Sequence, residues 1–315
     1  PTPQMTESFW NVISQSSSKR RKPENKIPAI KTSLTGLDPQ ENVLIWFGHS
    51  SYYFQIEGKR FLVDPVFSRA ASPFSFFNTA FAGADLYKPA DIPDIDYLVI
   101  THDHWDHLDY PTVKELKPRI GKVICPLGVG EHFVRWNFDE TNIIEMDWED
   151  RATLVSDFEI YCFPARHFSG RGLKRSRSLW ASFLLKSGTL TLFMGGDSGY
   201  DTHFADIGAC FDSIDFALLE NGQYNKAWKH IHMQPEETLQ AAADLRAKNV
   251  IPVHNSKFAM SNHDWDEPLQ RICEANDKQT NLRLLTPKIG EIAFLNDTTQ
   301  TFSRWWQEAE QITNH

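Results

Sequence analysis

From residue 43 onward, apolar runs of five to eight residues alternate with polar stretches rich in Gly, Pro, Asn, Asp and Ser. Such runs, enriched in Val, Ile, Leu and aromatic residues, are typical of β-strands joined by turns. The expected strands are VLIWF (43–47), SYYFQI (51–56), RFLVD (60–64), YLVITH (97–102), KVICP (122–126), FEIYCFP (158–164), WASFLLK (180–186), TLTLFMGG (189–196), FALLE (216–220), NVIPVH (249–254), LRLLTP (282–287) and GEIAFL (290–295).

Helical patterns fall between and after these strands. Residues 235–247 begin with Pro235, Glu236 and Glu237, which are favoured in the first turn of a helix. Further helices are expected at 109–117, 128–136, 265–275 and 300–312. Hairpin-spaced strands, followed by strands that alternate with helices, predict an α/β (α+β) fold in which two sheets pack together with helices outside.

The chain shows no internal repeat and no linker after residue 41, so we expect an N-terminal arm at 1–41 and a single domain at 42–315. The arm carries a serine run (16–18) followed by a basic cluster (19–22), a composition typical of a solvated segment. The alternative is that the basic cluster contacts an anionic lipid or a phosphate ligand.

Composition narrows the class of protein. The 315 residues are 41% hydrophobic and 23% charged, as in soluble globular proteins. The net charge of -9 argues against nucleic acid as the main partner, because affinity for nucleic acid comes largely from basic surface. Four scattered cysteines without a C-x-x-C pair indicate reduced thiols, which favours the cytoplasm.

The sequence leaves two questions about cellular location: whether the chain spans a membrane, and whether it has lost an N-terminal signal or anchor. No apolar run reaches the roughly 18 residues needed for a membrane span. The chain begins at Pro1 without a methionine, which leaves room for a processed or trimmed N-terminus and for a lost signal or anchor.

Metal-competent side chains are concentrated in T-H-D-H-W-D-H (101–107), at the end of an expected strand. Residues two apart on a strand point to the same face, so His102 and His104 can reach one point. Asp106 and His107 lie just beyond and can reach a second point. Imidazole and carboxylate are ligands of zinc and similar divalent metals. A structural zinc site would favour cysteines, and a chance H-x-H-x-D-H is expected in roughly one chain per thousand, so the pattern indicates a catalytic metal.

Three later strands each lead to a further metal-competent side chain. His167 follows FEIYCFPAR, Asp197 follows TLTLFMGG, and His254 ends NVIPVH. Any one of them alone would be interpreted as an ordinary hydrogen-bonded polar residue. Three in series after H-x-H-x-D-H predict a site for two metal ions.

This order of motifs, with Asp197 in a G-D-S-G context, resembles the metallo-β-lactamase superfamily of dinuclear hydrolases. More narrowly, the chain is similar to N-acylphosphatidylethanolamine-hydrolysing phospholipase D and its bacterial relatives. The matching stretches are GHSSYYFQIEGKRFLVDPVFSRAASP (48–73), ITHDHWDHLDY (100–110), PLGV (126–129), SLWASF (178–183), FMGGDSGY (193–200), IHMQPEET (231–238) and VHNSKFAM (253–260).

The resemblance implies a four-layer αββα sandwich with two Zn²⁺ ions, or iron or manganese, at one edge of the paired sheets. The ligands it implies are His102, His104 and His167 for one ion, Asp106, His107 and His254 for the second, and Asp197 as a bridge. An aspartate at 197, in place of a cysteine, is the pattern of phosphodiesterases and lactonases within the superfamily.

Two adjacent ions can bridge a water and lower its pKa toward neutrality, and the resulting hydroxide attacks phosphorus or a carbonyl carbon. Asp106 would then be both a ligand and a catalytic partner for the hydroxide's proton. No serine or cysteine nucleophile is required.

Residues around this motif bear on the substrate. Five cations follow one another at Arg166, Arg171, Lys174, Arg175 and Arg177, either to receive a phosphate or as an ordinary solvated loop. His232 precedes an expected helix N-terminus, a natural position for phosphate contact. Residues 66–81 carry five phenylalanines, either as a groove for acyl chains or as a flap packed on the sandwich. His49 is expected to hold a turn.

Three functions are consistent with these residues. The first is a zinc phosphodiesterase of phospholipase D type, the second a lactonase acting on a sugar lactone or a phosphorylated sugar lactone, and the third a metal-binding protein without turnover. The complete ligand set argues against the third, and the aromatic loop favours the first. We therefore expect a small-molecule or lipid-like anionic substrate that contacts His232 and Arg177, with peripheral membrane contact as an option.

Overall fold

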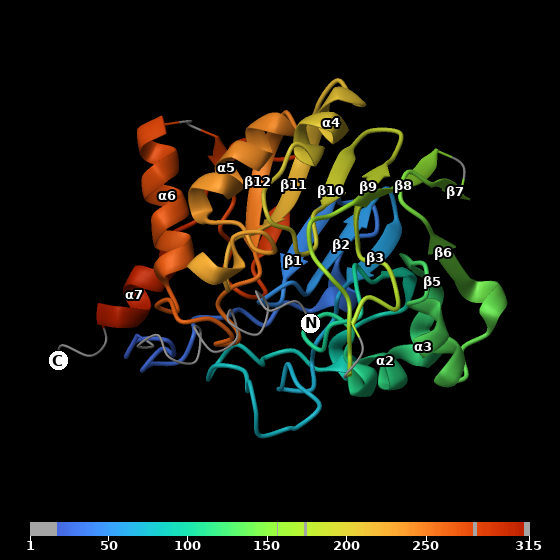
Figure 1. The fold of residues 1–315 in the computed structure, drawn as a ribbon, viewed down its shortest axis with the longest axis horizontal. Helices are drawn as coiled ribbons and strands as arrows, with labels where there is room; N and C mark the ends of the chain where they lie inside the picture. The colour runs from blue at the N-terminus through green and yellow to red at the C-terminus, as the bar shows by residue number, and fades with distance from the viewer. Residues whose placement is uncertain (1–17, 156, 173–174, 280–281, 312–315) are drawn as a thin grey trace.

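Two mixed seven-stranded sheets, stacked face to face, organise the chain (Figure 1). The computed structural model describes residues 18–155, 157–172, 175–279 and 282–311. The first sheet has the order β14 (Ile292–Phe294), β1 (Val43–Trp46), β2 (Tyr52–Ile56), β3 (Lys59–Val63), β4 (Ile95–Val99), β5 (Ile120–Pro126), β6 (Ile143–Met146). The second has the order β13 (Arg283–Leu284), β12 (Ala247–Val253), β11 (Ile214–Glu220), β10 (Thr191–Met194), β9 (Ala181–Lys186), β8 (Phe158–Pro164), β7 (Arg151–Val155).

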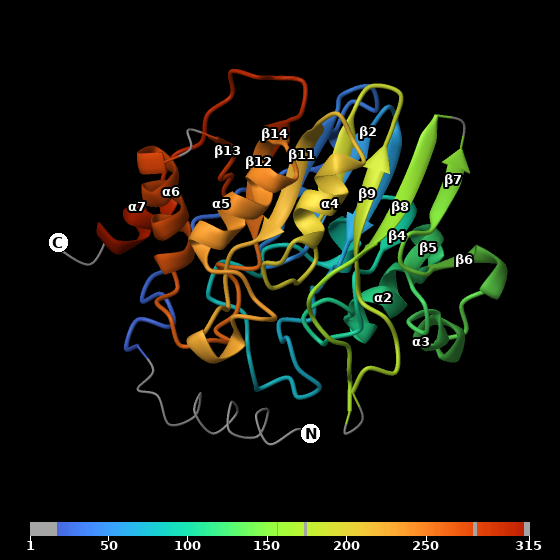
Figure 2. The same ribbon diagram turned by 45° about the horizontal axis from the view of Figure 1, so that its top comes forward.

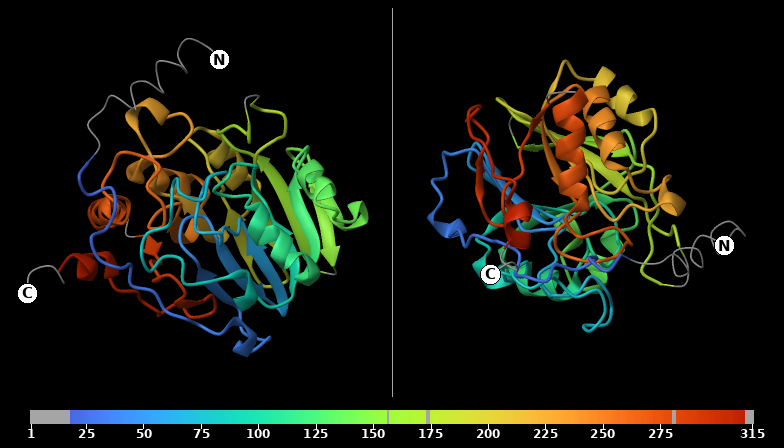
Figure 3. Two further views of the ribbon diagram at one scale, coloured as in Figure 1. Left: turned by 90° about the horizontal axis from the view of Figure 1, so that it is seen from below. Right: turned by 90° about the vertical axis from the view of Figure 1, so that its left-hand side faces the viewer.

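Helices cover the outer face of each sheet, as Figure 2 and the right panel of Figure 3 show. The α-helices are α2 (Tyr110–Leu116), α3 (Gly130–Arg135), α4 (His203–Ala209), α5 (Pro235–Asp244), α6 (Glu267–Gln279) and α7 (Trp305–Gln311). Short 3₁₀ turns are η1 (Leu34–Gly36), η2 (Pro89–Asp91), η3 (Lys117–Arg119), η4 (Glu140–Asn142) and η5 (Lys226–Trp228). No helix within the described ranges is long and apolar enough to cross a membrane.

Alternation along the strands explains the layers. On β4, Tyr97 and Val99 belong to the cluster between the two sheets, whereas Leu98 belongs to the cluster beneath α2 and α3. On β10, Phe193 likewise faces the cluster beneath α4 and α5. Because successive strand residues point to opposite faces, a strand buried on both sides must be apolar throughout. The result is the four-layer αββα arrangement predicted from the sequence.

Most of the strands predicted to lead to metal ligands have their carboxyl ends at the same edge of the sandwich. β3, β4, β5 and β6 are parallel neighbours, as are β10, β11 and β12. β8 lies antiparallel to β9, which lies antiparallel to β10, so β8 and β10 run the same way. In open α/β sheets, functional groups gather at the carboxyl ends of such strands.

Several element boundaries differ from those predicted. β4 ends at Val99 rather than at residue 102, and α5 ends at Asp244 because β12 already begins at Ala247. Among the described strands and α-helices, three were not predicted: β6, β7 and α4. The first two are half-exposed edge strands, and α4 is a seven-residue helix containing a glycine, so none carries a periodic apolar pattern long enough to detect.

The described part of the N-terminal arm packs against the body. Arg20 forms ion pairs with Asp264 and Asp266, and Arg21 donates hydrogen bonds to the carbonyls of Ala259 and Ser261. Both arginines therefore contact the body, although the Arg20 side chain remains 48% exposed to solvent. Residues 16 and 17 of the serine run lie outside the described residues.

Candidate metal centre

Three imidazoles, two from the loop that follows β4 and one from the loop after β8, meet at one point. His102 Nε2 lies 2.9 Å from His104 Nδ1, and His167 Nε2, from the loop after β8, lies 3.2 Å from the same atom. His102 and His104 therefore converge as predicted, but the prediction that strand spacing brings them together is wrong. Both residues lie beyond the end of β4, in irregular backbone, and not at strand spacing.

A second group lies beside the first. His107 Nε2 is 3.4 Å from Asp106 Oδ2, and His107 and His254 have ring centroids 5.4 Å apart. His254 follows β12 directly, with a left-handed backbone (φ 65°) that bends the chain at the strand end. All three side chains are buried.

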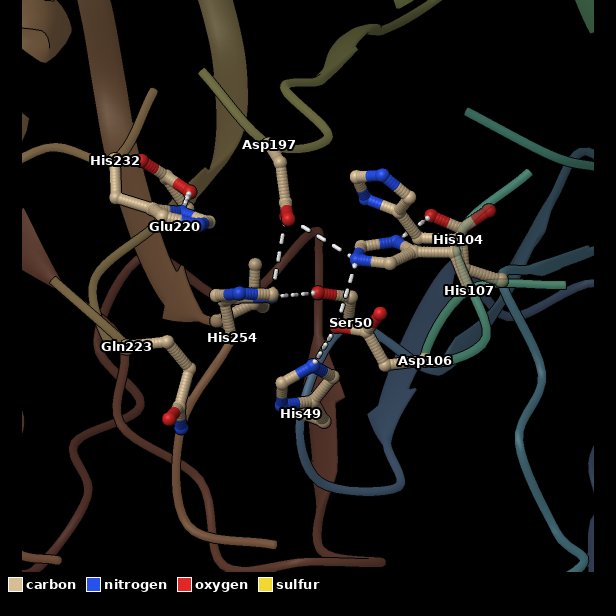
Figure 4. A network of polar contacts seen from close by, with 12 residues as sticks. His49, Ser50, His104, Asp106, His107, Asp197, Glu220, Gln223, His232 and His254 are labelled. Carbon is tan, nitrogen blue, oxygen red and sulfur yellow. Dashed lines mark hydrogen bonds and ion pairs between the residues drawn. The ribbon is translucent and has the colours of Figure 1, made fainter. Parts of the chain in front are cut away.

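Asp197 lies between the two groups, and Figure 4 shows its contacts with His107 and His254. Its Oδ2 atom is 3.9 Å from His102 Nε2 and 3.7 Å from His167 Nε2. Its Oδ1 atom is 3.3 Å from His107 Nε2 and 3.1 Å from His254 Nδ1. Each carboxylate oxygen thus faces a different group of histidines, which is the placement that a bridging carboxylate requires.

The backbone before Asp197 explains how this residue reaches the centre. Gly196 has φ 60°, and a Cβ atom there would lie 2.9 Å from the Thr101 Cβ and 3.1 Å from the Ala181 carbonyl oxygen. Only glycine combines the left-handed conformation with so close an approach. The G-G-D sequence therefore lets the turn after β10 pass against the H-x-H loop.

Unsatisfied buried atoms show that the residues fit metal ions. His107 Nε2, His254 Nε2 and Asp197 Oδ1 have no hydrogen-bond partner among the described residues, although each is buried. Buried polar atoms of native proteins are nearly always satisfied. His107 Nε2 and Asp197 Oδ1 approach to 3.3 Å without hydrogen-bond geometry, as expected of atoms directed at a common third point. The donor set of imidazoles and carboxylates suits divalent transition metals.

Outer hydrogen bonds orient several of these side chains. His107 Nδ1 donates to Asp64 Oδ2 at 2.7 Å, and Asp64 also accepts from the backbone N–H and hydroxyl of Thr101. His167 Nδ1 donates to the Ile231 carbonyl at 3.0 Å. Such partners set which imidazole nitrogen is free to bind a metal. Sequence analysis missed Asp64, although its place at the end of the strand RFLVD was the same signal that identified Asp197 and His254.

His49 does more than hold a turn. Its left-handed backbone (φ 54°) lies in the turn between β1 and β2, as expected. In addition, its Nε2 atom donates to Asp106 Oδ2 at 2.8 Å, and its ring lies 4.1 Å from the ring of His254. His49 therefore fixes the orientation of the Asp106 carboxylate from a fully buried position.

The protonation states of most of the histidines suit metal binding. Burial lowers the pKa of His102, His167 and His254 well below the usual value for histidine. A lowered pKa keeps these imidazoles neutral, which is the form that ligates a metal.

His107 is the exception. Burial alone would lower its pKa, but the negative charges of Asp197, Asp106 and Asp64 raise it well above the usual value. The raised pKa indicates surplus negative charge at this point. A divalent cation would neutralise that charge in place of the proton.

His232 lies at the rim of the same centre. Its ring centroid is 5.1 Å from that of His167 and 5.3 Å from that of His254. Its Nδ1 atom donates to Glu220 Oε2 at 2.8 Å, and the Met233 N–H donates to the other carboxylate oxygen of Glu220. Burial raises the pKa of Glu220 to about 7, while Glu220 raises the pKa of His232 against the effect of burial. His232 lies just before α5, as predicted; Glu220 was not predicted as its partner.

The four described cations around His167 do not act as one cluster. Arg171 lies over the Trp105 ring at 3.7 Å and donates to the carbonyls of Asp103 and Leu108, so it supports the H-x-H-x-D-H loop. Arg166 pairs with Asp201, and Arg175 lies over the Phe168 ring. Arg177 is exposed, and Lys174 lies outside the described residues.

Comparison with known proteins adds a family context. Residues 59–255 match the Beta-lactamase superfamily domain. An uncharacterized protein of Mycobacterium tuberculosis is 36% identical over 86% of this chain and 73% of its own length. N-acyl-phosphatidylethanolamine-hydrolyzing phospholipase D 1 of Caenorhabditis elegans is 31% identical over 78% of this chain and 74% of its own length. The structure of a metallo hydrolase from the archaeon Ignicoccus hospitalis shares the fold, with a TM-score of 0.58 at 20% identity over 81% of this chain and 98% of that one.

Proposed function

This chain belongs to the metallo-β-lactamase superfamily of metal-dependent hydrolases, and on that basis we propose that it is a dinuclear zinc phosphodiesterase of the phospholipase D type. The observation that carries the proposal is the position of Asp197. Its two oxygens face two separate histidine groups, so one carboxylate can be shared by two ions.

In this proposal the ligands are His102, His104 and His167 for one ion, Asp106, His107 and His254 for the other, and Asp197 for both. When bound, two such ions supply Lewis acidity that lowers the pKa of a water toward neutrality and offsets charge on the substrate oxygens. Imidazoles and carboxylates are common ligands of zinc. The same ligands also bind iron and manganese.

Hydrolysis of a phosphodiester joins a water oxygen to phosphorus and breaks the bond from phosphorus to the leaving alcohol. We assign Asp106 to accept the proton of the attacking water. His49 holds that carboxylate through its Nε2–H, which keeps Asp106 turned toward the centre. Asp106 then returns this proton to the leaving oxygen, which departs as the alcohol.

His232 is assigned to the substrate. Glu220 raises the pKa of His232 and so favours the imidazolium, in which Nδ1–H donates to Glu220 and Nε2–H is left to donate to a phosphate oxygen. Arg177, exposed in the loop after His167, is proposed as a second contact for the anion.

Support for the phosphodiester, rather than a lactone, comes from the relative in Caenorhabditis elegans, a phospholipase D at 31% identity. The test is a parallel screen of the zinc-loaded protein against bis(4-nitrophenyl) phosphate, N-acylphosphatidylethanolamine and sugar lactones. Turnover of both phosphodiesters, with Arg177→Ala raising KM more than it lowers kcat, is the expected result. Turnover of lactones alone would reject the phosphodiesterase and leave the hydrolase.

A further inference from the structure

Three phenylalanines project into solvent from the loop after β3. Phe74, Phe76 and Phe77 are 60%, 81% and 58% exposed, and we call residues 72–78 the aromatic tip. Phe67 and Phe81, from the same loop, are buried. The loop is therefore neither a groove lined by five phenylalanines nor a packed flap: its base packs on the body and its tip does not.

The tip is the main concentration of exposed large apolar side chains within the described ranges. The remaining ones are scattered and only 37–42% exposed: Ile30, Tyr110, Leu127 and Val134. From Ala70 to Ala84 the chain carries no charged residue, and Ser, Asn, Thr, Pro, Gly and Ala fill the positions between the phenylalanines. Large exposed apolar patches of this kind mark an interaction site.

Hydrogen bonds hold the tip in its projecting position. The Ala71 N–H donates to the Asn78 carbonyl at 3.1 Å, and the Ala80 N–H donates to the Arg69 carbonyl at 2.7 Å, which closes the loop on itself. The Phe74 N–H also donates to the Ser72 hydroxyl, and the Phe74 and Phe76 rings stack at 5.7 Å.

Both ends of the loop stand on segments that carry residues of the metal centre. Ser68 hydrogen-bonds through its N–H and hydroxyl to Asp109, two residues after His107. The Phe81 N–H donates to the carbonyl of Lys257, three residues after His254. Figures 1 and 2 show the loop, in cyan, extending from the lower side of the molecule. The aromatic tip therefore stands at the edge of the sandwich where the centre lies.

We propose that the aromatic tip inserts into the surface of a lipid bilayer and turns the metal centre toward it. A bilayer is favoured over a protein partner because the apolar side chains occupy a short projecting turn, whereas a stable protein interface needs about 800 Å² on each partner. Phenylalanine side chains on an amphipathic element enter the boundary between headgroups and acyl chains.

The bilayer must be recognised by apolar contact rather than by charge. The net charge of -9 opposes attraction to anionic lipid, and Arg20 and Arg21 of the basic cluster are engaged within the molecule. Binding to zwitterionic vesicles should therefore depend little on salt, because screening weakens only electrostatic attraction.

Flotation of the full chain with dioleoylphosphatidylcholine vesicles tests the proposal. The wild-type protein should float with the vesicles, and each of Phe74→Ser, Phe76→Ser and Phe77→Ser should lower the partition coefficient by about tenfold. The triple variant should stay with the soluble fraction while keeping its metal content and circular dichroism. Val134→Ser, which removes an apolar side chain exposed elsewhere, serves as the matched control and should float as the wild type does.

Three results would overturn the proposal: no flotation of the wild type, equal flotation of the triple variant, or flotation that is lost between about 0.1 and 0.5 M NaCl. Concentration-dependent dimerisation that the triple variant loses, without flotation, would assign the tip to a second copy of the chain. The inference does not rest on the proposed reaction. Asp197→Ala, expected to lack turnover, should float like the wild type, so the two proposals fail separately.

Discussion

Asp197 is the residue on which the two histidine groups converge. Each of its oxygens faces two imidazole nitrogens at 3.1–3.9 Å, so its loss should affect both groups at once. Asp197→Ala should abolish turnover, by about 10³-fold or more, even with excess zinc, and should lower metal content below one ion per chain. Metal analysis together with phosphodiester turnover would check this.

The matched control for Asp197 is Asp201→Ala, which removes a more exposed carboxylate four residues along that pairs with Arg166. Metal content and turnover should stay near the wild-type values in that variant. Near-normal turnover of Asp197→Ala would instead mean that another residue links the two groups.

Lys257 provides a pH-dependent test of the packing beside the centre. Its amine is fully buried and donates to the carbonyls of Phe47 and Val66, and among the described residues it forms no ion pair with a carboxylate. Burial lowers its pKa from 10.5 to about 7. Between these two pH values the unfolded chain binds more protons than the folded chain, so this residue makes stability rise as pH increases.

In Lys257→Met this contribution disappears. The free energy of unfolding of the wild type, relative to the variant, should therefore increase between pH 7 and pH 10, by at most about 5 kcal/mol. Denaturant unfolding of both proteins across this range measures the difference. Parallel pH profiles would show that the lysine is no more basic in the unfolded chain than in the folded one.

At the scale of secondary-structure elements, the residues at strand ends are the part of this site that can best be predicted from the sequence. Each of His167, Asp197 and His254 could be found because an apolar run leads to it, and the carboxyl ends of these strands meet at one edge. The four-layer arrangement could be predicted for the same reason, since buried strands read as continuous apolar runs.

Contacts between distant segments could not be predicted in this way. Asp103 accepts hydrogen bonds from the Gly170 N–H and from His132, and Arg171 holds the loop that carries the histidines. These bonds join residues 29 to 68 positions apart, so no local pattern reports them. The pairing of His49 with Asp106 is hidden for the same reason.

The loops after β11 and β12 approach each other closely, so a larger residue in one loop should displace the other. A Cβ atom at Gly222 would lie 2.2 Å from the carbonyl oxygen of His254. Gly222→Ala should therefore displace the backbone of His254 and weaken zinc binding about 10- to 100-fold, as loss of ligand support does elsewhere. Competition with a chromogenic chelator measures the affinity.

Gly172→Ala is the matched control, because a Cβ atom there would meet nothing within 4 Å. Zinc affinity should be unchanged in that variant. If both alanine variants bound zinc as the wild type does, the contact between Gly222 and His254 would not support the centre.

On the scale of the whole molecule, the two sheets are joined by polar contacts at opposite edges. At one edge, Glu57 in the β2–β3 turn accepts hydrogen bonds from Ser187 and Thr189 in the β9–β10 turn. At the other edge, the first sheet supplies His102, His104, Asp106 and His107, and the second supplies His167, Asp197 and His254. Figure 3 shows both sheets from two further directions.

Removal of metal should therefore loosen one edge only. Without a cation, the ligand edge keeps buried carboxylates, a positively charged His107 and unsatisfied imidazole nitrogens. A ligand that binds only the folded chain adds about 4 kcal/mol of stability at a thousand times its dissociation constant, so chelation should lower the unfolding midpoint by several degrees. Hydrogen exchange should accelerate at 101–109 and 254–258 and stay unchanged at 57–59 and 187–190. Uniformly faster exchange in all four segments would mean that the metal stabilises the fold as a whole. Unchanged exchange at 101–109 and 254–258 would mean that these segments keep their structure without the metal.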